Sequence, residues 1–277
     1  MLVELVSAGS ESGEVNRSGV EISSDGIKMR FLIVSCAGLL CGVGTVFAEG
    51  GIDLKVSADC LSKYIWRGQN ISDESVFQQS VSLSKWGFTG SVWGNLDLKN
   101  ENDNAGDFTE LDFTVDYTAK VPGVDWMSLS VGAIHYQFPS TNFRPTTEIY
   151  GGLGLSVPFS PSIRIYRDVD EIDGGYVQLG IGHTFEKIAG FSKTCYCGLQ
   201  LGAALGYGGS QYNKGYFGVK EGKFNDLTLS AGFPICIGPQ WTVRPSISYS
   251  TMLSDSIRTA TANSGNLWMG IGILASF

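Results

Sequence analysis

About twelve segments after residue 50 alternate between apolar and polar or small residues at every second position. The clearest is 108–119, in which Phe113, Val115 and Tyr117 alternate with acidic and hydroxyl-bearing residues. Successive side chains of a strand point to opposite faces, so each segment has one apolar face and one polar face. The repeated period of two therefore predicts an all-β chain.

Segment length and spacing narrow the fold further. Many segments are close to the ~9–11 residues that a tilted strand needs to cross a bilayer. Connections are mostly tight after the even-numbered segments, and several are longer and more polar after the odd-numbered ones. This is typical of an antiparallel up-and-down transmembrane β-barrel of about twelve strands. The expected strands span 52–66, 76–84, 87–98, 108–119, 127–138, 146–157, 162–168, 175–186, 195–208, 224–236, 240–252 and 266–277.

The strands of a soluble β-sandwich or lipocalin-like barrel would also alternate, so alternation alone does not distinguish a soluble protein from a membrane protein. Charged residues make up only 17% of the chain, below the roughly one quarter that is usual in soluble domains. Tryptophans gather near the segment ends, as in an interfacial girdle, and the chain ends on Phe277 after an alternating apolar row. These features favour a barrel in the outer membrane.

The first residues differ in character from the rest. Residues 1–28 are polar and patternless, and Met29 is the expected true start. Residues 29–48 carry a basic residue, a short apolar run and small residues before a cleavage position, which is typical of a signal peptide. A single anchor helix is the alternative, but the apolar run is short for one. The barrel is expected to occupy 49–277.

Export to an oxidising compartment permits disulfides. Because Cys195 and Cys197 lie two apart, they would share one face of a strand and are poorly placed to bond each other. They are interpreted as small apolar residues near the barrel rim, with a bridge to a neighbouring strand left open. The expected mature chain also contains Cys60 and Cys236, whose disulfide state the sequence leaves open.

Several function classes are disfavoured. A net charge of −8 and the lack of a basic stripe argue against nucleic acid. No nucleophile elbow, zinc helix or phosphate loop occurs, so no catalytic residue, metal or cofactor is predicted. His135 and His183 are interpreted as residues facing lipid or headgroups rather than as catalytic bases. The charged run 167–174 is interpreted as a solvated hairpin turning at Asp173-Gly174 rather than as a calcium site.

Several short sequence motifs resemble those of a known family. The string from Leu61 to Gln69, followed by Ser72-Asp73, is similar to the opening motif of the TorF family of bacterial outer-membrane porins. Further similar motifs are Gly87 to Leu98, Glu110-Leu111-Asp112, Val131-Gly132-Ala133, Tyr136-Gln137-Phe138-Pro139 and Glu148-Ile149-Tyr150-Gly151-Gly152. The resemblance covers about 52–186 and implies a porin-like barrel, with little inherited mechanism.

Charged residues on the polar faces are the candidate pore lining, because an apolar exterior turns them towards the lumen. They are Asp59, Arg67, Glu110, Asp112, Asp116, Glu148, Arg164 and Arg244. Opposed arginines and carboxylates would set the ion selectivity of a water-filled pore. Neutralising Glu110, Asp112 and Asp116 is then expected to change cation preference.

The expected function is a passive channel for small polar solutes or ions. The alternative is a non-conducting structural or binding barrel whose outer loops contact partners, and an outer-membrane enzyme is the least favoured reading. The expected partners are outer-membrane lipid, the permeating solutes or ions, and a barrel-assembly machine that reads the C-terminal strand ending at Phe277.

Overall fold

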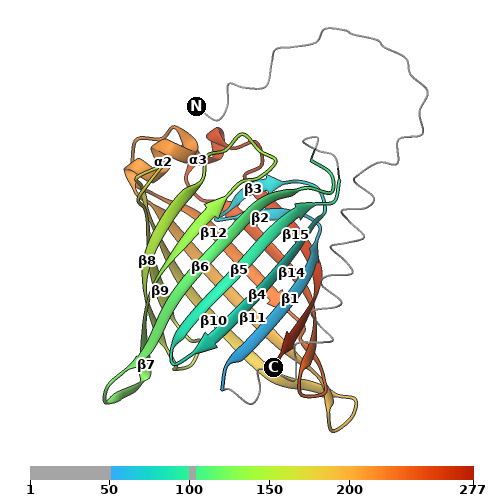
Figure 1. Cartoon of the computed structure of the whole chain (residues 1–277). Helices are drawn as coiled ribbons and strands as arrows, with labels where there is room; N and C mark the ends of the chain where they lie inside the picture. Colours follow the sequence, from blue (N-terminus) through green and yellow to red (C-terminus); the bar gives the residue numbers. More distant parts are fainter. Residues whose placement is uncertain (1–50, 100–103) are drawn as a thin grey trace, which may run out of the picture.

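The computed structural model describes residues 51–99 and 104–277. The predicted extension (1–28) and signal peptide (29–48) lie outside the described residues. In the described chain, antiparallel strands form one large sheet of thirteen strands, and pairing of β10 with β11 closes it into a barrel (Figure 1). Strand β13 continues the line of β12, because both pair with β11 and β14, so the wall has twelve strands.

The wall strands follow one another around the barrel in chain order. They are β1 (Asp53–Leu61), β4 (Val76–Lys85), β5 (Phe88–Asp97), β6 (Phe108–Val121), β7 (Val124–Gln137), β8 (Thr146–Leu155), β9 (Ser162–Asp168), β10 (Gly175–Gly190), β11 (Cys195–Gly208), β12 (Lys223–Gly232) with β13 (Ile235–Ile237), β14 (Trp241–Met252) and β15 (Gly265–Ser276). The predicted twelve-stranded up-and-down barrel is confirmed.

The alternation of the sequence maps onto the two faces of this wall. Large apolar side chains stand exposed on the outside, among them Val115 (63%), Val131 (59%) and Met269 (57%). Polar residues of the opposite parity face inward, where Gln78 hydrogen-bonds Asn95 and Tyr150 hydrogen-bonds Asp116. An apolar exterior around a polar interior is the arrangement of an outer-membrane barrel. The described residues contain no helix that could cross a bilayer.

The two ends of the barrel differ. Tight turns join the strands at one end, which we take as periplasmic; at the turn from β4 to β5, Trp86 (φ 54°) and Gly87 (φ 88°) both lie in the left-handed region. The C-terminus lies at the same end (Figure 1). Here the main chain of Phe277 exchanges two hydrogen bonds with Leu54 of β1, at 3.0 and 2.9 Å, and so completes the seam between β1 and β15.

The opposite, extracellular end carries the longer connections and the remaining elements (Figure 1). These are the hairpin strands β2 (Tyr64–Trp66) and β3 (Gln69–Ser72) and the helices α2 (Ser210–Phe217) and α3 (Asp255–Ala260). The prediction of one wall strand over 52–66 was wrong at its end: β1 stops at Leu61, and Tyr64–Trp66 pairs only with β3 in a separate two-stranded sheet. The chain leaves the wall here because the hairpin turns into the lumen.

Candidate functional site

The hairpin 64–72, which we call the plug, crosses the extracellular half of the lumen. Trp66 pairs with Gln69 across the two-residue turn Arg67-Gly68, and both turn residues have positive φ (46° and 78°). A turn of this kind favours glycine at its second position. At Gly68 the requirement is also steric, because a Cβ there would lie 2.5 Å from Cβ of Asp226 on β12. The tip of the plug therefore touches the far wall.

The plug is fastened by a salt bridge that we call the latch. Arg67 donates to both carboxylate oxygens of Glu148 on β8, at 2.8 and 2.7 Å, and the side chains are only 7% and 2% exposed. Tyr136 donates a third bond to Glu148, at 2.8 Å. Burial alone would lower the pKa of Arg67, but neighbouring Tyr212 and Glu148 raise it well above its ordinary value. The guanidinium therefore stays charged inside the protein.

Aromatic rings enclose the same guanidinium. Its central carbon lies 4.4 Å from the ring centroids of Trp66, Tyr166 and Tyr176, and 5.8 Å from that of Tyr212. Ring faces attract a cation, and the attraction grows when water is excluded. Burial raises the pKa of Tyr212, which keeps its hydroxyl neutral. Arg67 is thus bound by one carboxylate and surrounded by four aromatic rings.

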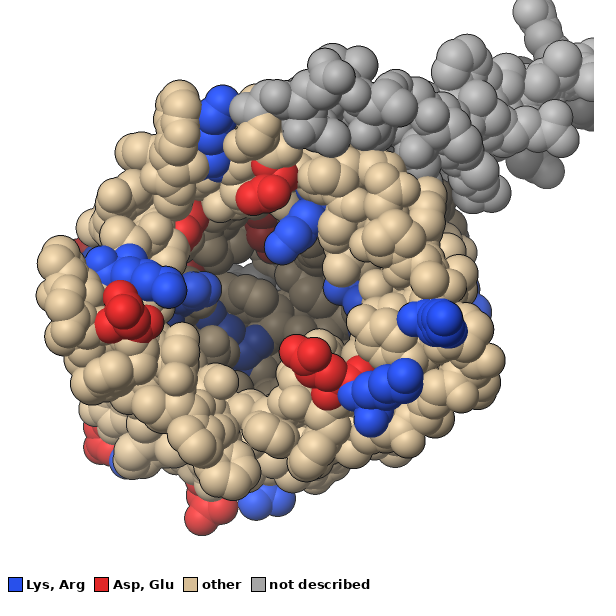
Figure 2. Space-filling view, turned by 90° about the horizontal axis from the view of Figure 1, so that it is seen from below, with Lys and Arg blue, Asp and Glu red and all other residues tan. Residues whose placement is uncertain are grey.

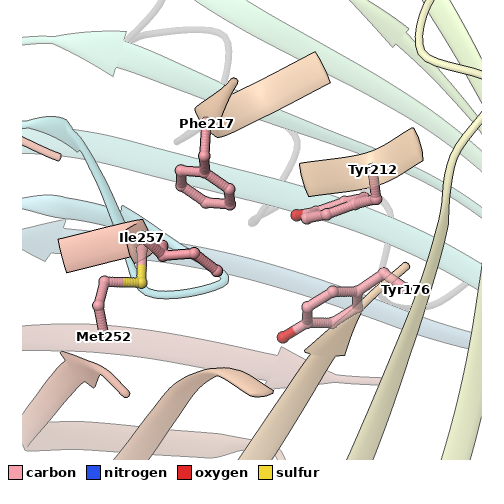
Figure 3. Close-up of a cluster of buried hydrophobic side chains, with 5 residues drawn as sticks. All are labelled: Tyr176, Tyr212, Phe217, Met252 and Ile257. Carbon is pink, nitrogen blue, oxygen red and sulfur yellow. The ribbon is translucent and has the colours of Figure 1, made fainter. Parts of the chain in front are cut away.

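An apolar cluster above the latch joins the plug to the outer loops. Side chains from β10, α2, β14 and α3 converge on one point (Figure 3). The buried members of this mouth cluster are Tyr176, Tyr212, Phe217, Met252 and Ile257, and Trp66, Tyr166, Tyr216 and Val219 pack against them. The extracellular mouth is therefore a small hydrophobic core rather than a set of independent loops.

The periplasmic half of the lumen differs. Seen from this end, the molecule is deeply hollowed, and charged side chains line the hollow (Figure 2). We call this space the vestibule and define it by the inward-facing Lys55, Asp59, Asp116, Arg164 and Arg244. Arg244 donates to both oxygens of Asp59 at 3.0 Å, whereas Asp116 accepts from Tyr150 and Thr118 at 2.6 and 2.7 Å.

The structure places the predicted residues at two levels. Glu110, Asp112 and Glu148 face inward near the extracellular ends of their strands, and Tyr64 of the plug donates to Glu110 at 2.9 Å. Asp59, Asp116, Arg164 and Arg244 lie below them in the vestibule. Arg67 also faces the lumen, but it does so from the plug rather than from a wall strand, because the chain leaves β1 at Leu61. Whether these residues line a path for solutes stays a prediction.

Sequence reasoning missed the tyrosines of the lumen. Tyr136, Tyr150, Tyr166 and Tyr176 all occupy the inward parity of their strands, and three of them donate to a buried or half-buried carboxylate. Their signal was available: an aromatic residue on the polar face of an alternating segment has no lipid to contact and must pack against something inside. Their partners were not apparent from the sequence, because the carboxylates lie on other wall strands and the guanidinium of Arg67 comes from the plug.

No family model matches the chain, and no curated protein matches it significantly. Solved structures of outer-membrane barrels are similar in overall shape. They include a NanC porin (13% identity, TM-score 0.47, covering 80% of this chain and 98% of that one), a KdgM porin (13%, 0.48, 81% and 99%) and LpxR from Salmonella typhimurium (9%, 0.48, 80% and 99%). At these values the likeness adds nothing to what the strand pairing shows by itself.

Proposed function

We propose that the chain forms a passive outer-membrane channel for small polar solutes or ions, narrowed at its extracellular end by the plug. One observation carries the proposal: Arg164 and Lys55 face the inside of the barrel and yet are exposed. Exposed charged side chains inside a closed wall mean that water reaches the vestibule. A polar, hydrated interior is what a channel needs and what a barrel packed solid with side chains lacks.

The test is the conductance of the refolded protein in planar bilayers, with heat-modifiable migration on a gel to show that each barrel is folded. We expect discrete conductance steps from the natural chain. A variant with 64–72 replaced by a short Gly-Ser linker should give larger steps, because the plug spans the lumen. A folded barrel without steps in either form would contradict the channel.

The second candidate is a non-conducting structural or binding barrel. The close packing of the mouth cluster favours this second candidate, since Tyr176, Tyr212 and Ile257 are almost completely buried at the extracellular end. Silence of the natural chain together with steps from the linker variant would identify a barrel that is closed at rest and conducts only without its plug.

We also propose that the assembly machinery of the outer membrane reads strand β15. Leu267, Met269, Ile271 and Ile273 form an exposed apolar row along its outer face, and Phe277 follows at the seam. Replacing Phe277 with Ala removes the ring at the end of the row while leaving main-chain pairing possible. We expect slower appearance of the heat-modifiable form in cells, with unchanged refolding of the purified chain. Equal assembly in cells would contradict the proposal.

A further inference from the structure

Four neighbouring strands share an uncharged area on the inner face of the barrel wall. The pairing of β10, β11, β12 and β14 sets inward-facing residues side by side in rows. From the extracellular to the periplasmic side, three successive rows are Gly180, Ala204, Thr228 and Ser250, then Gly182, Gly202, Ser230 and Ser248, then Thr184, Gln200, Gly232 and Ser246. We call these twelve residues the neutral sector.

Charges of both signs border the neutral sector. In the row above it, Arg164 lies on β9 and Asp226 on β12, where Asp226 is 2% exposed and accepts from Tyr176. Below it, Glu186 follows on β10 and Arg244 on β14. Two acids and two bases therefore surround the sector, and the border favours neither cations nor anions.

The side chains of the neutral sector are short. Five of its twelve residues are glycine or alanine, and most of the others are serine or threonine. The hydroxyls stay near the wall: a Cβ at Gly202 would lie 2.7 Å from Oγ of Ser230, and Thr228 and Ser250 hydrogen-bond each other at 2.8 Å. The sector therefore leaves space on its side of the hollow that opens to the periplasm (Figure 2).

Several polar groups of the neutral sector are free to contact a solute. Thr184, Gln200 and Ser230 are exposed, and no other described side chain hydrogen-bonds to them. By contrast, Asp59 and Arg244 in the vestibule bind each other. A hydroxyl or an amide both donates and accepts, which matches the hydroxyl groups of a polyol. The sector holds no counter-charge for a carboxylate or an ammonium group.

From this arrangement we infer that the neutral sector is the wall along which solutes bind in the vestibule, and that these solutes are small uncharged polyhydroxy compounds. The inference rests on the proposed channel function and names its substrate class. The sector ends beneath the plug, since a Cβ at Gly68 would lie 2.5 Å from Cβ of Asp226. The charged residues expected from the sequence as pore lining then border the path rather than form its binding surface.

The first experiment compares swelling rates of liposomes that contain the full chain, after subtraction of the rate without protein. Xylitol and triethylene glycol have nearly the same mass, but xylitol carries a hydroxyl on every carbon. The natural chain should admit xylitol faster. Thr184→Val with Gln200→Leu should lower the xylitol-to-triethylene-glycol ratio by up to about fivefold, the effect of one net hydrogen bond.

The matched control removes two hydroxyls from the far side of the lumen. Ser91 and Thr114 are neighbours on β5 and β6 and face inward, and Ser91→Ala with Thr114→Val should leave the ratio unchanged. Each variant is also made in the chain whose residues 64–72 are replaced by the Gly-Ser linker, so that a closed plug does not hide the effect. Heat-modifiable migration shows that each barrel is folded.

The second experiment introduces charge into the neutral sector and measures reversal potentials in planar bilayers under a gradient of potassium chloride. Gln200→Glu and Gln200→Lys should shift the cation-to-anion permeability ratio in opposite directions, each by up to about fivefold, the effect of one unit charge a few ångströms from an ion in water. The same changes at Gln211, exposed on the extracellular helix α2, should have little effect.

A swelling ratio that Thr184→Val with Gln200→Leu leaves unmoved would overturn the inference, and so would a permeability ratio that is insensitive to charge at Gln200. A ratio that falls equally in the control with Ser91 and Thr114 would show that solutes do not prefer the neutral sector. A folded barrel that neither conducts nor admits solute, with or without its plug, would instead contradict the channel function.

Discussion

The latch offers the sharpest test of how the mouth is held closed. Replacing Arg67 with Met keeps a long apolar side chain in the aromatic enclosure but leaves the carboxylate of Glu148 with only Tyr136 as a donor. Removing one partner of a buried ion pair costs about 3–5 kcal/mol, because the other charge stays buried without compensation. Glu148→Gln should cost a similar amount by leaving the guanidinium unpaired among rings.

The double variant is expected to lose much less than the sum of the two single variants, since it buries no unpaired charge. A coupling energy of at least about 2 kcal/mol is expected from equilibrium unfolding in detergent, followed by heat-modifiable migration. The control pair is Lys63 and Asp73, a salt bridge between the two residues that flank the plug, whose side chains are 27% and 46% exposed. There the coupling should stay below about 1 kcal/mol.

Additive losses at Arg67 and Glu148 would refute the reasoning, because they would show that the two side chains do not stabilise each other. The pH dependence gives a second check. The folded-state pKa of Arg67 is raised, so its contribution to stability is fully present below its unfolded pKa and is lost only as pH rises through the higher folded value. Deprotonation of Arg67 should therefore not break the salt bridge below about pH 12. Conductance that rises steeply at milder alkaline pH would show that another group holds the plug.

Two further predictions concern the wall. Val115→Arg places a charge on the outer face of β6 and should lower the free energy of unfolding by about 2–4 kcal/mol if the site is near the middle of the bilayer. Thr114→Arg, on the inner face, should cost far less stability and should reduce conductance instead. Equal losses of stability would show that Val115 does not face lipid. Gly206→Ala should destabilise the barrel by about 1–3 kcal/mol, because its Cβ would collide with the Tyr176 hydroxyl. Gly90→Ala, which meets no atom within 4 Å, is its control and should be neutral or slightly stabilising when thermal unfolding is compared; a similar loss at both glycines would refute the steric argument.

The wall was predictable from the sequence because each of its residues faces one of two solvents. Lipid outside and water inside leave a period of two in every strand, as in β6, where Phe113 and Val115 point out and Asp112 and Asp116 point in. That regular contrast gave the strand count and the inward parity of the charged residues. It needed no knowledge of which strands are neighbours.

The plug was not predictable in the same way, because its contacts join segments far apart in the chain. Arg67 and Glu148 are separated by 81 positions, and the sequence around either residue does not indicate that the two form a pair. Tyr64 and Trp66 also continue the alternation of β1, so the pattern runs on after the chain has left the wall. The helices α2 and α3 are too short, at eight and six residues, to show a helical period.

The plug also affects the order in which the barrel can be built. It hangs from β1, the strand that β15 must join to close the wall, and its tip touches β8, β10, β12 and β14. A segment near the start of the barrel thus contacts strands from its middle and its end through the interior. It can gather and align those strands before the seam is formed. The same hairpin that narrows the finished pore would then also align the strands while the barrel assembles.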